Sequence, residues 1–287
     1  MFESDSAAKK QIFKDKHTLL EGYVSEYLFE KQFITNKGRS CVKGCWVAVN
    51  NAKRYLFVLN STDDSFEKQL VDFLSTQFEV WKVYNINNEW IFESNGRKYC
   101  LDAFAKHEGL IKNKPLSAVS QTRDSQRQQQ CCDFFIEKGI LQEVAFTRCF
   151  ADDILSPYFG SVVNIDFITR NKDGKYCIIE TKYKYEDHSG CFGINVGQIK
   201  LFEILHNMGC LVYNVILYNY TKNDRVSVFD FLQMSGREKQ WIISEITDFD
   251  YSRLKLAPTK TSVDGKKKQG FYPVEKNKYR LLGELVY

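Results

Sequence analysis

The chain contains Ile165-Asp166-Phe167 and, after a short polar segment, Ile178-Ile179-Glu180-Thr181-Lys182. Each has the apolar residues of a buried strand with charged side chains among them. Because an isolated charge is costly to bury, charged residues in such runs need partners. Two carboxylates and an ammonium held together on neighbouring strands would form a site for a divalent metal ion and a phosphate. These residues therefore predict a piece of sheet and a candidate site on it.

The segment between the two strands has the composition of a tight turn. Asn171-Lys172-Asp173-Gly174 places Asp-Gly between two strand-like runs, which favours a hairpin. Side chains alternate between the two faces of a strand, so we expect Glu180, Lys182 and Lys184 on one face of the second strand. A register that brings Asp166 beside Glu180 would complete the site.

The predicted site suits one Mg²⁺ ion, for which Mn²⁺ would substitute. Asp166 and Glu180 are the expected carboxylate ligands, and the backbone carbonyl of Thr181 is the expected third ligand. Mg²⁺ in proteins usually keeps several waters, so two carboxylates are enough. Lys182 would then lie next to the attacking water or the scissile phosphate, where its charge can stabilise the transition state.

The acid-x-Lys pattern is not specific by itself. Asp173-Gly174-Lys175 and Asp264-Gly265-Lys266 also match it, but both are glycine turns in polar surroundings and are interpreted as solvated loops. Glu180-Thr181-Lys182 ends an apolar strand and has an acid upstream at the end of another. The alternative interpretation is a cross-strand ion pair on a half-exposed sheet, worth roughly 0–1 kcal/mol.

A helix and a further strand are predicted downstream. Apolar residues recur every three positions from Val196 to Met208, close to the helical period. Asn195 is a suitable N-cap and Gly209 a suitable C-terminal stop. Leu211–Tyr218 is interpreted as a buried strand, and residues 186–190 as a mobile loop whose histidine is solvated. The resulting order is strand, hairpin, strand, helix, strand.

This order and these residues resemble the PD-(D/E)XK nuclease superfamily, the restriction-endonuclease-like fold. The resemblance covers about residues 120–220. It implies an α/β fold in which a mixed central sheet is flanked by helices in the order α-β-β-β-α-β. It also implies an active site made by Asp166, Glu180, Lys182 and, on the following helix, Gln198.

The chain departs from the family pattern at two places. Ile165 stands where a proline often precedes the first acid, which is common in the superfamily. The family often has a glutamate on the first core helix, which is expected here at residues 125–138. Gln128 and Gln129 stand where that glutamate is expected, so the site would have two carboxylates and favour one metal ion. Glu143, expected at the start of the next strand, is a possible substitute.

Length and composition allow more than one domain. The chain has 287 residues, of which 44% are hydrophobic, enough for a substantial core. We expect an N-terminal α+β domain at residues 1–115, a nuclease-like core at 116–250 and a basic C-terminal extension at 251–287. The polar stretch 107–127 is the expected linker. A role in recognition or oligomerisation is a hypothesis for the N-terminal domain.

Several classes of protein are disfavoured by the sequence. No apolar run approaches the 18 residues of a membrane span, and the acidic, polar N-terminus does not have the order of a secretory signal. The nine cysteines have no zinc-type spacing, although a zinc or iron–sulfur site stays open as a minor alternative. Cys100, Cys149, Cys177 and Cys210 lie in or beside apolar runs and are interpreted as small core residues, which predicts a reducing, cytoplasmic location.

The net charge of +4 is too small to indicate nucleic-acid binding, but its distribution is more informative. The C-terminal segment from Ser252 is basic and contains interleaved aromatic residues. It could follow a phosphate backbone, with Lys266, Lys267 and Lys268 as the densest cluster, or simply pack on the core. Lys184 adds positive charge beside the predicted site and, with Lys266, Lys267 and Lys268, is an expected nucleic-acid contact.

The predicted function is a Mg²⁺-dependent endonuclease that acts on DNA. Two alternatives stay open: a nuclease of the same fold that acts on RNA or a junction, and a non-catalytic nucleic-acid-binding module. No base-reading motif separates DNA from RNA. One active site cuts one strand, so double-strand breaks would need a symmetric dimer or two sequential nicks.

Overall fold

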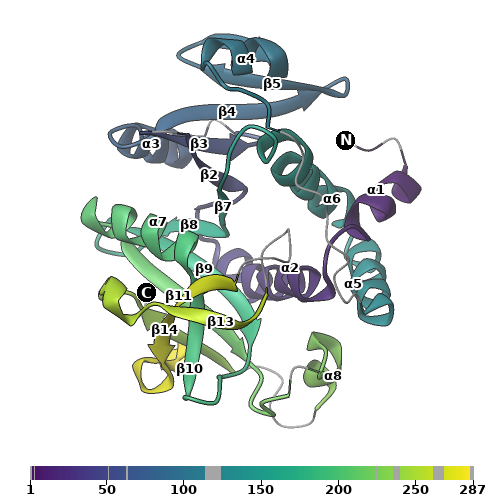
Figure 1. Ribbon diagram of the computed structural model, residues 1–287, viewed down its shortest axis with the longest axis vertical. Coiled ribbons are helices and arrows are strands. Elements are labelled where there is room, and N and C mark those ends of the chain that lie inside the picture. Colours follow the sequence, from purple (N-terminus) through teal and green to yellow (C-terminus); the bar gives the residue numbers. More distant parts are fainter. Residues whose placement is uncertain are drawn as a thin grey trace. The chain divides into compact units, whose positions relative to one another are not determined.

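The computed structural model describes residues 2, 4–50, 52–62, 64–113, 124–223, 225–234, 240–260 and 268–284, and only the backbone of 257–260, 268, 269 and 284. It is a mixed α/β structure, as expected (Figure 1). The chain folds into two compact units. The first comprises Met1–Lys14, Ser40–Pro115 and Phe135–Phe167, and the second comprises Asp15–Arg39, Leu116–Phe134 and Ile168–Tyr287.

These units are not the three consecutive segments that the sequence suggested. The chain passes between the units several times, so each unit combines segments that are distant in sequence. The roles expected for residues 1–115 and 251–287 stay predictions. No helix in the described parts of the chain is long and apolar enough to span a membrane.

The first unit is built on a six-stranded sheet in the order β6-β5-β4-β3-β2-β7. Its strands are β2 (Cys45–Asn50), β3 (Lys53–Leu59), β4 (Glu79–Ile86), β5 (Glu89–Ser94), β6 (Arg97–Cys100) and β7 (Val162–Ile165). β3 and β4 are parallel, and the other neighbouring pairs are antiparallel. Asn50 pairs with Lys53, so β2 and β3 form a hairpin.

Aromatic side chains dominate the core of the first unit. Phe92 stacks on Phe104 at a centroid distance of 4.3 Å, and Phe57 meets Phe104 edge-on at 5.9 Å. All three rings are buried. The remaining elements of this unit are α1 (Asp5–Ile12), β1 (Cys41–Val42), α3 (Ser65–Leu74), α4 (Leu101–His107), α6 (Leu141–Cys149) and a π-helical turn (Phe150–Leu155).

The expectation that Glu143 begins a strand is wrong. Glu143 lies in the first turn of α6, and its carboxylate pairs with Lys43 at 2.8 Å. The buried residues of this helix include Leu141, Val144 and Ala145, which share the helical spacing of three and four. That spacing is the period of a helix and not the alternation of a strand.

The second unit contains a mixed sheet in which β8, β9, β11, β12 and β15 follow one another. Their bounds are β8 (Phe167–Arg170), β9 (Tyr176–Lys184), β11 (Leu211–Tyr218), β12 (Trp241–Glu245) and β15 (Arg280–Leu281). β9 and β11 are parallel, whereas β12 is antiparallel to both β11 and β15. The predicted turn before β9 is confirmed, since Asn171 N donates to Lys175 O at 3.0 Å and Gly174 has a φ of 79°.

The helices of the second unit include α2 (His17–Phe29), the part of α5 (Ser125–Glu137) up to Phe134, α7 (Val196–Asn207) and α8 (Val228–Gln233). Short π and 3-10 turns follow α2 at Glu30–Ile34 and Thr35–Lys37. α2 contacts β9, and α7 contacts β11. The predicted bounds of α7 are confirmed: Asn195 is its N-cap, and Gly209, with a φ of 92°, follows its C-cap.

The expected C-terminal extension contributes strands to the second unit. β13 (Lys255–Lys260) and β14 (Lys268–Glu275) form a small sheet with β10 (Cys191–Asn195) in the order β10-β14-β13. The short 3-10 turns of this segment are Tyr251–Arg253, Lys276–Lys278 and Leu282–Glu284. β10 and β14 approach closely at Gly193, where a Cβ atom would lie 2.9 Å from Phe271 Cδ2.

Candidate functional site

Three of the predicted site residues meet on one face of β9. The carboxylate of Glu180 is 2% exposed, and its Oε1 lies 2.5 Å from Lys182 Nζ. The side-chain amide of Gln198, in the first turn of α7, donates to the same oxygen. A buried carboxylate is therefore held between an ammonium and an amide.

Local structure explains why these residues meet. Glu180 and Lys182 are two positions apart on a strand, so their side chains leave the same face. On α7, Ile199, Phe202 and Leu205 are fully buried, and Gln198 lies at the start of this buried stripe. The sequence patterns of β9 and α7 thus bring the three side chains together.

The ion pair is buried at one end and open at the other. The side chain of Glu180 is 2% exposed, whereas that of Lys182 is 26% exposed. A carboxylate so deeply buried needs its partners, because removing one of them leaves an uncompensated charge. The side chain of Lys182, by contrast, stays partly exposed to solvent.

Lys184 continues the row on the same face of β9. Its Nζ donates to the backbone carbonyl of Gly193 on β10 at 2.5 Å. Burial, together with the positive charge of Lys182, lowers the pKa of Lys184 to about 8. Of the other predicted nucleic-acid contacts, Lys266 and Lys267 lie outside the described residues, and Lys268 is described only by its backbone in β14.

Asp166 separates two strands rather than ending one. It follows β7, which pairs with β2 in the first unit, and precedes β8, which belongs to the sheet of the second. It is 5% exposed, and its Oδ1 accepts a hydrogen bond from Asn164 Nδ2 at 2.6 Å. Asp166 belongs to the first unit, whereas Glu180 belongs to the second. The metal ion that the two were expected to share stays a prediction, as does the role of the Thr181 carbonyl.

The candidates for the missing first-helix glutamate have contacts of their own. Gln128 is buried and donates through Nε2 to the carbonyl of Asp15 at 2.5 Å. Gln129 donates to Asp133 at 2.7 Å on the exposed side of α5. Neither these contacts nor the surface ion pair of Glu143 indicates a role in metal binding.

The donor set suits a metal ion with few protein ligands. Within the described ranges, no group of three or more histidine, cysteine, aspartate or glutamate side chains is placed to hold a metal ion. Mg²⁺ is commonly bound through one or two carboxylates, with waters and substrate phosphates completing its octahedron. Glu180, a buried carboxylate beside a partly open cation, fits that pattern, whereas a tetrahedral zinc site would need more ligands.

The loop at residues 186–190, which was expected to be mobile, is held in place by a second charged cluster. Glu186 is buried, and its carboxylate contacts Lys222 at 2.6 Å and Lys276 at 2.9 Å. Tyr218 donates to it at 2.5 Å. Burial alone would raise the pKa of Glu186, but these three donors outweigh it and lower the pKa to about 2. His188, in the same loop, is exposed.

Nothing local in the sequence predicts this cluster, because the donors to Glu186 come from distant segments. The turn after Glu186 is also ordered locally. The Asp187 carboxylate accepts hydrogen bonds from the Ser189 backbone N–H at 2.8 Å and from the Cys191 backbone N–H at 2.9 Å. An aspartate followed two positions later by serine is a signal for such a turn, and it could have been found in the sequence.

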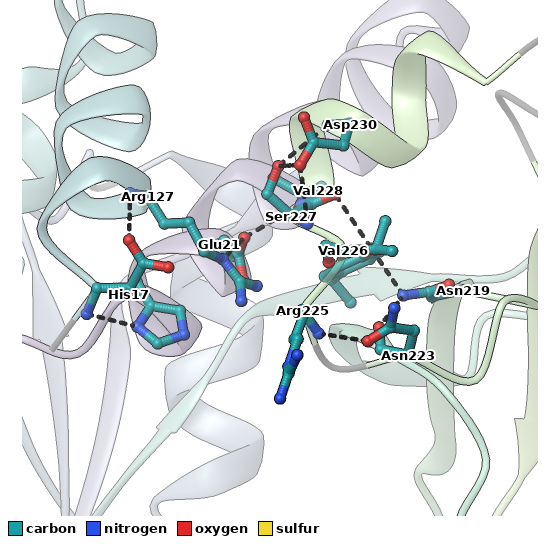
Figure 2. A network of polar contacts seen from close by, with 12 residues as sticks. His17, Glu21, Arg127, Asn219, Asn223, Arg225, Val226, Ser227, Val228 and Asp230 are labelled. Carbon is teal, nitrogen blue, oxygen red and sulfur yellow. Dashed lines mark hydrogen bonds and ion pairs between the residues drawn. The ribbon is translucent and has the colours of Figure 1, made fainter. Parts of the chain in front are cut away.

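A second polar network lies on the opposite face of β9. Figure 2 shows Arg127, from α5, directed at Glu21 of α2, with Val228 at the start of α8 beside them. Arg127 Nε and Nη2 lie 3.0 and 2.5 Å from the two oxygens of Glu21, and Val228 N donates to Glu21 Oε1 at 3.1 Å. Tyr183 OH donates to the carbonyl of Val226 at 3.0 Å, and Tyr183 directly follows Lys182 on the strand, so it points to the other face. This network therefore stabilises β9 on the face opposite the side chains of Glu180 and Lys182.

Comparison with protein families, with characterised proteins and with solved structures finds no match to the chain. The chemistry of the site therefore follows from its own residues. They are a buried carboxylate, a partly exposed lysine paired with it, an amide that donates to the same carboxylate and a second partly exposed lysine on the same strand.

Proposed function

We propose that this protein is a Mg²⁺-dependent endonuclease that hydrolyses phosphodiester bonds of DNA. The observation that supports it best is the contact of Lys182 and Gln198 with the same carboxylate oxygen of the buried Glu180. Such a reaction needs a carboxylate for the metal ion and a cation for the phosphate. Here both groups lie on one strand and are oriented by the following helix. It is also the set that the resemblance to the PD-(D/E)XK superfamily implies.

Each residue has a role that follows from its position. A Mg²⁺ ion held by Glu180 would supply positive charge at the phosphate and lower the pKa of the attacking water. Lys182, already beside that carboxylate, stabilises the negative charge that develops on the phosphoryl oxygens. Gln198 fixes the rotamer of Glu180, as hydrogen-bonding partners of metal ligands usually do.

Asp166 is the second carboxylate that the proposal needs. With it, the site would have the two acidic ligands that Mg²⁺ commonly takes from a protein. Asp166→Asn keeps the shape and the acceptor for Asn164 but removes the charge. The proposal expects this variant to need a higher Mg²⁺ concentration for half-maximal cleavage, and an unchanged Mg²⁺ dependence would remove Asp166 from the site.

The proposal is tested by incubating supercoiled plasmid with the full chain and Mg²⁺, Mn²⁺ or EDTA. Wild type should nick or linearise the plasmid with either metal and not with EDTA. Glu180→Gln and Lys182→Met should each lower the rate by about 10²–10³-fold, the loss typical of removing one preorganised charge-stabilising group. Lys200→Met, which changes an exposed lysine on α7, serves as the matched control. Cleavage that persists in both site variants would reject the proposal.

The same assay decides between the remaining alternatives. Faster cleavage of RNA or of single strands would redirect the activity away from duplex DNA. Binding without cleavage would indicate a non-catalytic module, an alternative supported by Gln128, whose amide is engaged by a backbone carbonyl where the family often has a glutamate. A linear product formed without a nicked intermediate would indicate a symmetric dimer.

A further inference from the structure

β9 presents a row of charged side chains at alternate positions. Glu180, Lys182 and Lys184 leave the same face and follow one another at about 6.6 Å, two residues of strand rise. On the parallel neighbour β11, Ile216 is paired with Lys182 and Tyr218 with Lys184. The two lysines therefore lie side by side along one strand, each with a fixed neighbour.

The ammonium of Lys184 has fewer hydrogen-bond acceptors than it has donors. An ammonium has three hydrogen-bond donors. Among the described residues, the only acceptor found for Lys184 is the neutral carbonyl of Gly193, and no carboxylate pairs with it. Lys184 is only partly buried, and this burial, together with the charge of Lys182, lowers its pKa to about 8. A charge in this position is stabilised if an anion joins it.

The surrounding charges do not supply that anion. Lys182 is paired with Glu180, while Lys222 and Lys276 share the carboxylate of Glu186. The described contacts therefore pair each of Lys182, Lys222 and Lys276 with a carboxylate and pair Lys184 with none. A divalent cation beside Glu180 would add further positive charge to this row.

We propose that Lys184 binds a second phosphate of the nucleic-acid strand, next to the phosphate that Lys182 contacts. This inference rests on the proposed function, which places the scissile phosphate at Lys182. Consecutive phosphates of one strand are separated by a distance similar to that between alternate residues of a β-strand, so one lysine can meet each phosphate. Lys184 then makes a phosphate beside the scissile bond part of what the site recognises.

The consequence is a preference for polynucleotides over isolated phosphodiesters. A substrate without a neighbouring phosphate would leave Lys184 bound only to Gly193. Lys184 would then add nothing to the binding of that substrate. The competing explanation is that Lys184 only fastens β9 to β10 through that carbonyl. Lys184→Gln keeps a hydrogen-bond donor but removes the charge, whereas Lys184→Arg keeps the charge, so the pair of variants separates the two explanations.

The first measurement is binding of a fluorescein-labelled 20-mer DNA in EDTA, followed by anisotropy over a range of NaCl concentrations. Losing one phosphate contact should reduce the slope of log K against log salt by about 0.7–0.9. We expect that reduction for Lys184→Gln, an unchanged slope for Lys184→Arg, and an unchanged slope for the control Lys200→Gln. Thermal melting of each variant shows whether the fold is retained. If Lys184→Gln melts early, the comparison is made below its melting temperature.

The second measurement compares two substrates with Mg²⁺. Lys184→Gln should slow the cleavage of DNA by about 10-fold or more, and leave the hydrolysis of bis(p-nitrophenyl) phosphate, which has no neighbouring phosphate, at the wild-type rate. An unchanged salt slope, or an equal loss on both substrates, would overturn the role of Lys184. Failure of the wild type to cleave either substrate would instead reject the proposed function. The salt dependence of binding would still show whether Lys184 contacts a phosphate.

Discussion

Replacing Arg127 by methionine should destabilise the second unit strongly and in a pH-dependent way. Arg127 and Glu21 form a buried ion pair in which the arginine side chain is 11% exposed and the glutamate side chain 2%. The carboxylate accepts two hydrogen bonds from the guanidinium and one from Val228 N (Figure 2). Methionine fills much of the same volume but leaves Glu21 with the backbone donor alone.

The size of the effect follows from that burial. Removing one partner of a buried pair costs about 3–5 kcal/mol, because the remaining charge stays away from water. For a unit of this size, 1 kcal/mol lowers the melting temperature by about 2–4 °C, so Arg127→Met should lower it by roughly 6–20 °C. Lys98→Met, which breaks an exposed pair with Glu93, should cost less than about 1 kcal/mol.

The pH dependence identifies the cause. Burial raises the pKa of Glu21 above its ordinary value, although hydrogen bonds from Arg127 oppose the shift. The folded chain thus holds this proton more tightly than the unfolded chain. Protonated Glu21 therefore contributes stability that is fully present below its ordinary pKa. This stability is lost as the pH rises through the pKa of Glu21 in the folded chain. Without Arg127 the pKa rises further, so the deficit of Arg127→Met should be smaller at pH 5 than at pH 8.

Urea unfolding at pH 5 and pH 8, followed by circular dichroism, measures these differences. The double variant Glu21→Gln with Arg127→Met removes the buried charge, so it should recover part of the loss and have the weaker pH dependence. A loss for Arg127→Met below 1 kcal/mol at both pH values would refute the reasoning. So would a deficit that grows as the pH falls.

Three further predictions concern the site and its supports. Gln198→Ala removes the amide from Glu180 and should weaken Mg²⁺ activation of cleavage by about 10–100-fold, read from a metal titration; an unchanged titration would argue against its orienting role. Burial opposes ionisation of Glu186, yet its three donors bring its pKa down to about 2, so the stability it contributes is lost as pH falls from about 4.5 towards 2. Glu186→Gln should therefore cost about 1–3 kcal/mol at pH 7 and flatten the acid limb of urea unfolding, whereas an unaltered acid limb would contradict this. Gly193→Ala places a Cβ 2.9 Å from Phe271 Cδ2 and should cost about 1–3 kcal/mol in thermal melts, while Gly160→Ala, with nothing within 4 Å, should melt like wild type.

Features that depend on neighbouring residues could be predicted from the sequence. The turn at Asn171–Gly174 follows from its asparagine and glycine, and the limits of α7 follow from Asn195, Gly209 and the apolar stripe between them. The shared face of Glu180 and Lys182 follows from the alternation of side chains on a strand. These are local rules, and the structure confirms each of them.

Features that depend on distant residues could not be predicted. The apolar run from Val162 to Phe167 gives no sign that it is divided at Asp166, because the division depends on the partners that β7 and β8 find elsewhere. The loop beginning at Glu186 has a polar composition typical of mobile segments, yet Lys276 reaches it from the C-terminal segment. Tertiary contacts decide both cases, and a single sequence does not show them.

The two faces of β9 have different contacts. The Glu180–Lys182 pair faces α7, whereas Tyr183 points to the other side, where Val226 and Ser227 accept its hydroxyl at 3.0 and 3.2 Å. The backbone beside Lys182 is thus held by contacts on the face opposite the Glu180–Lys182 pair. It follows that a variant of the polar network of Glu21 and Arg127 should lose stability while keeping its cleavage rate below its melting temperature. A variant of Lys182 leaves the buried Glu180 carboxylate without its ammonium, so it should also lose stability, but it should lose cleavage even below its melting temperature.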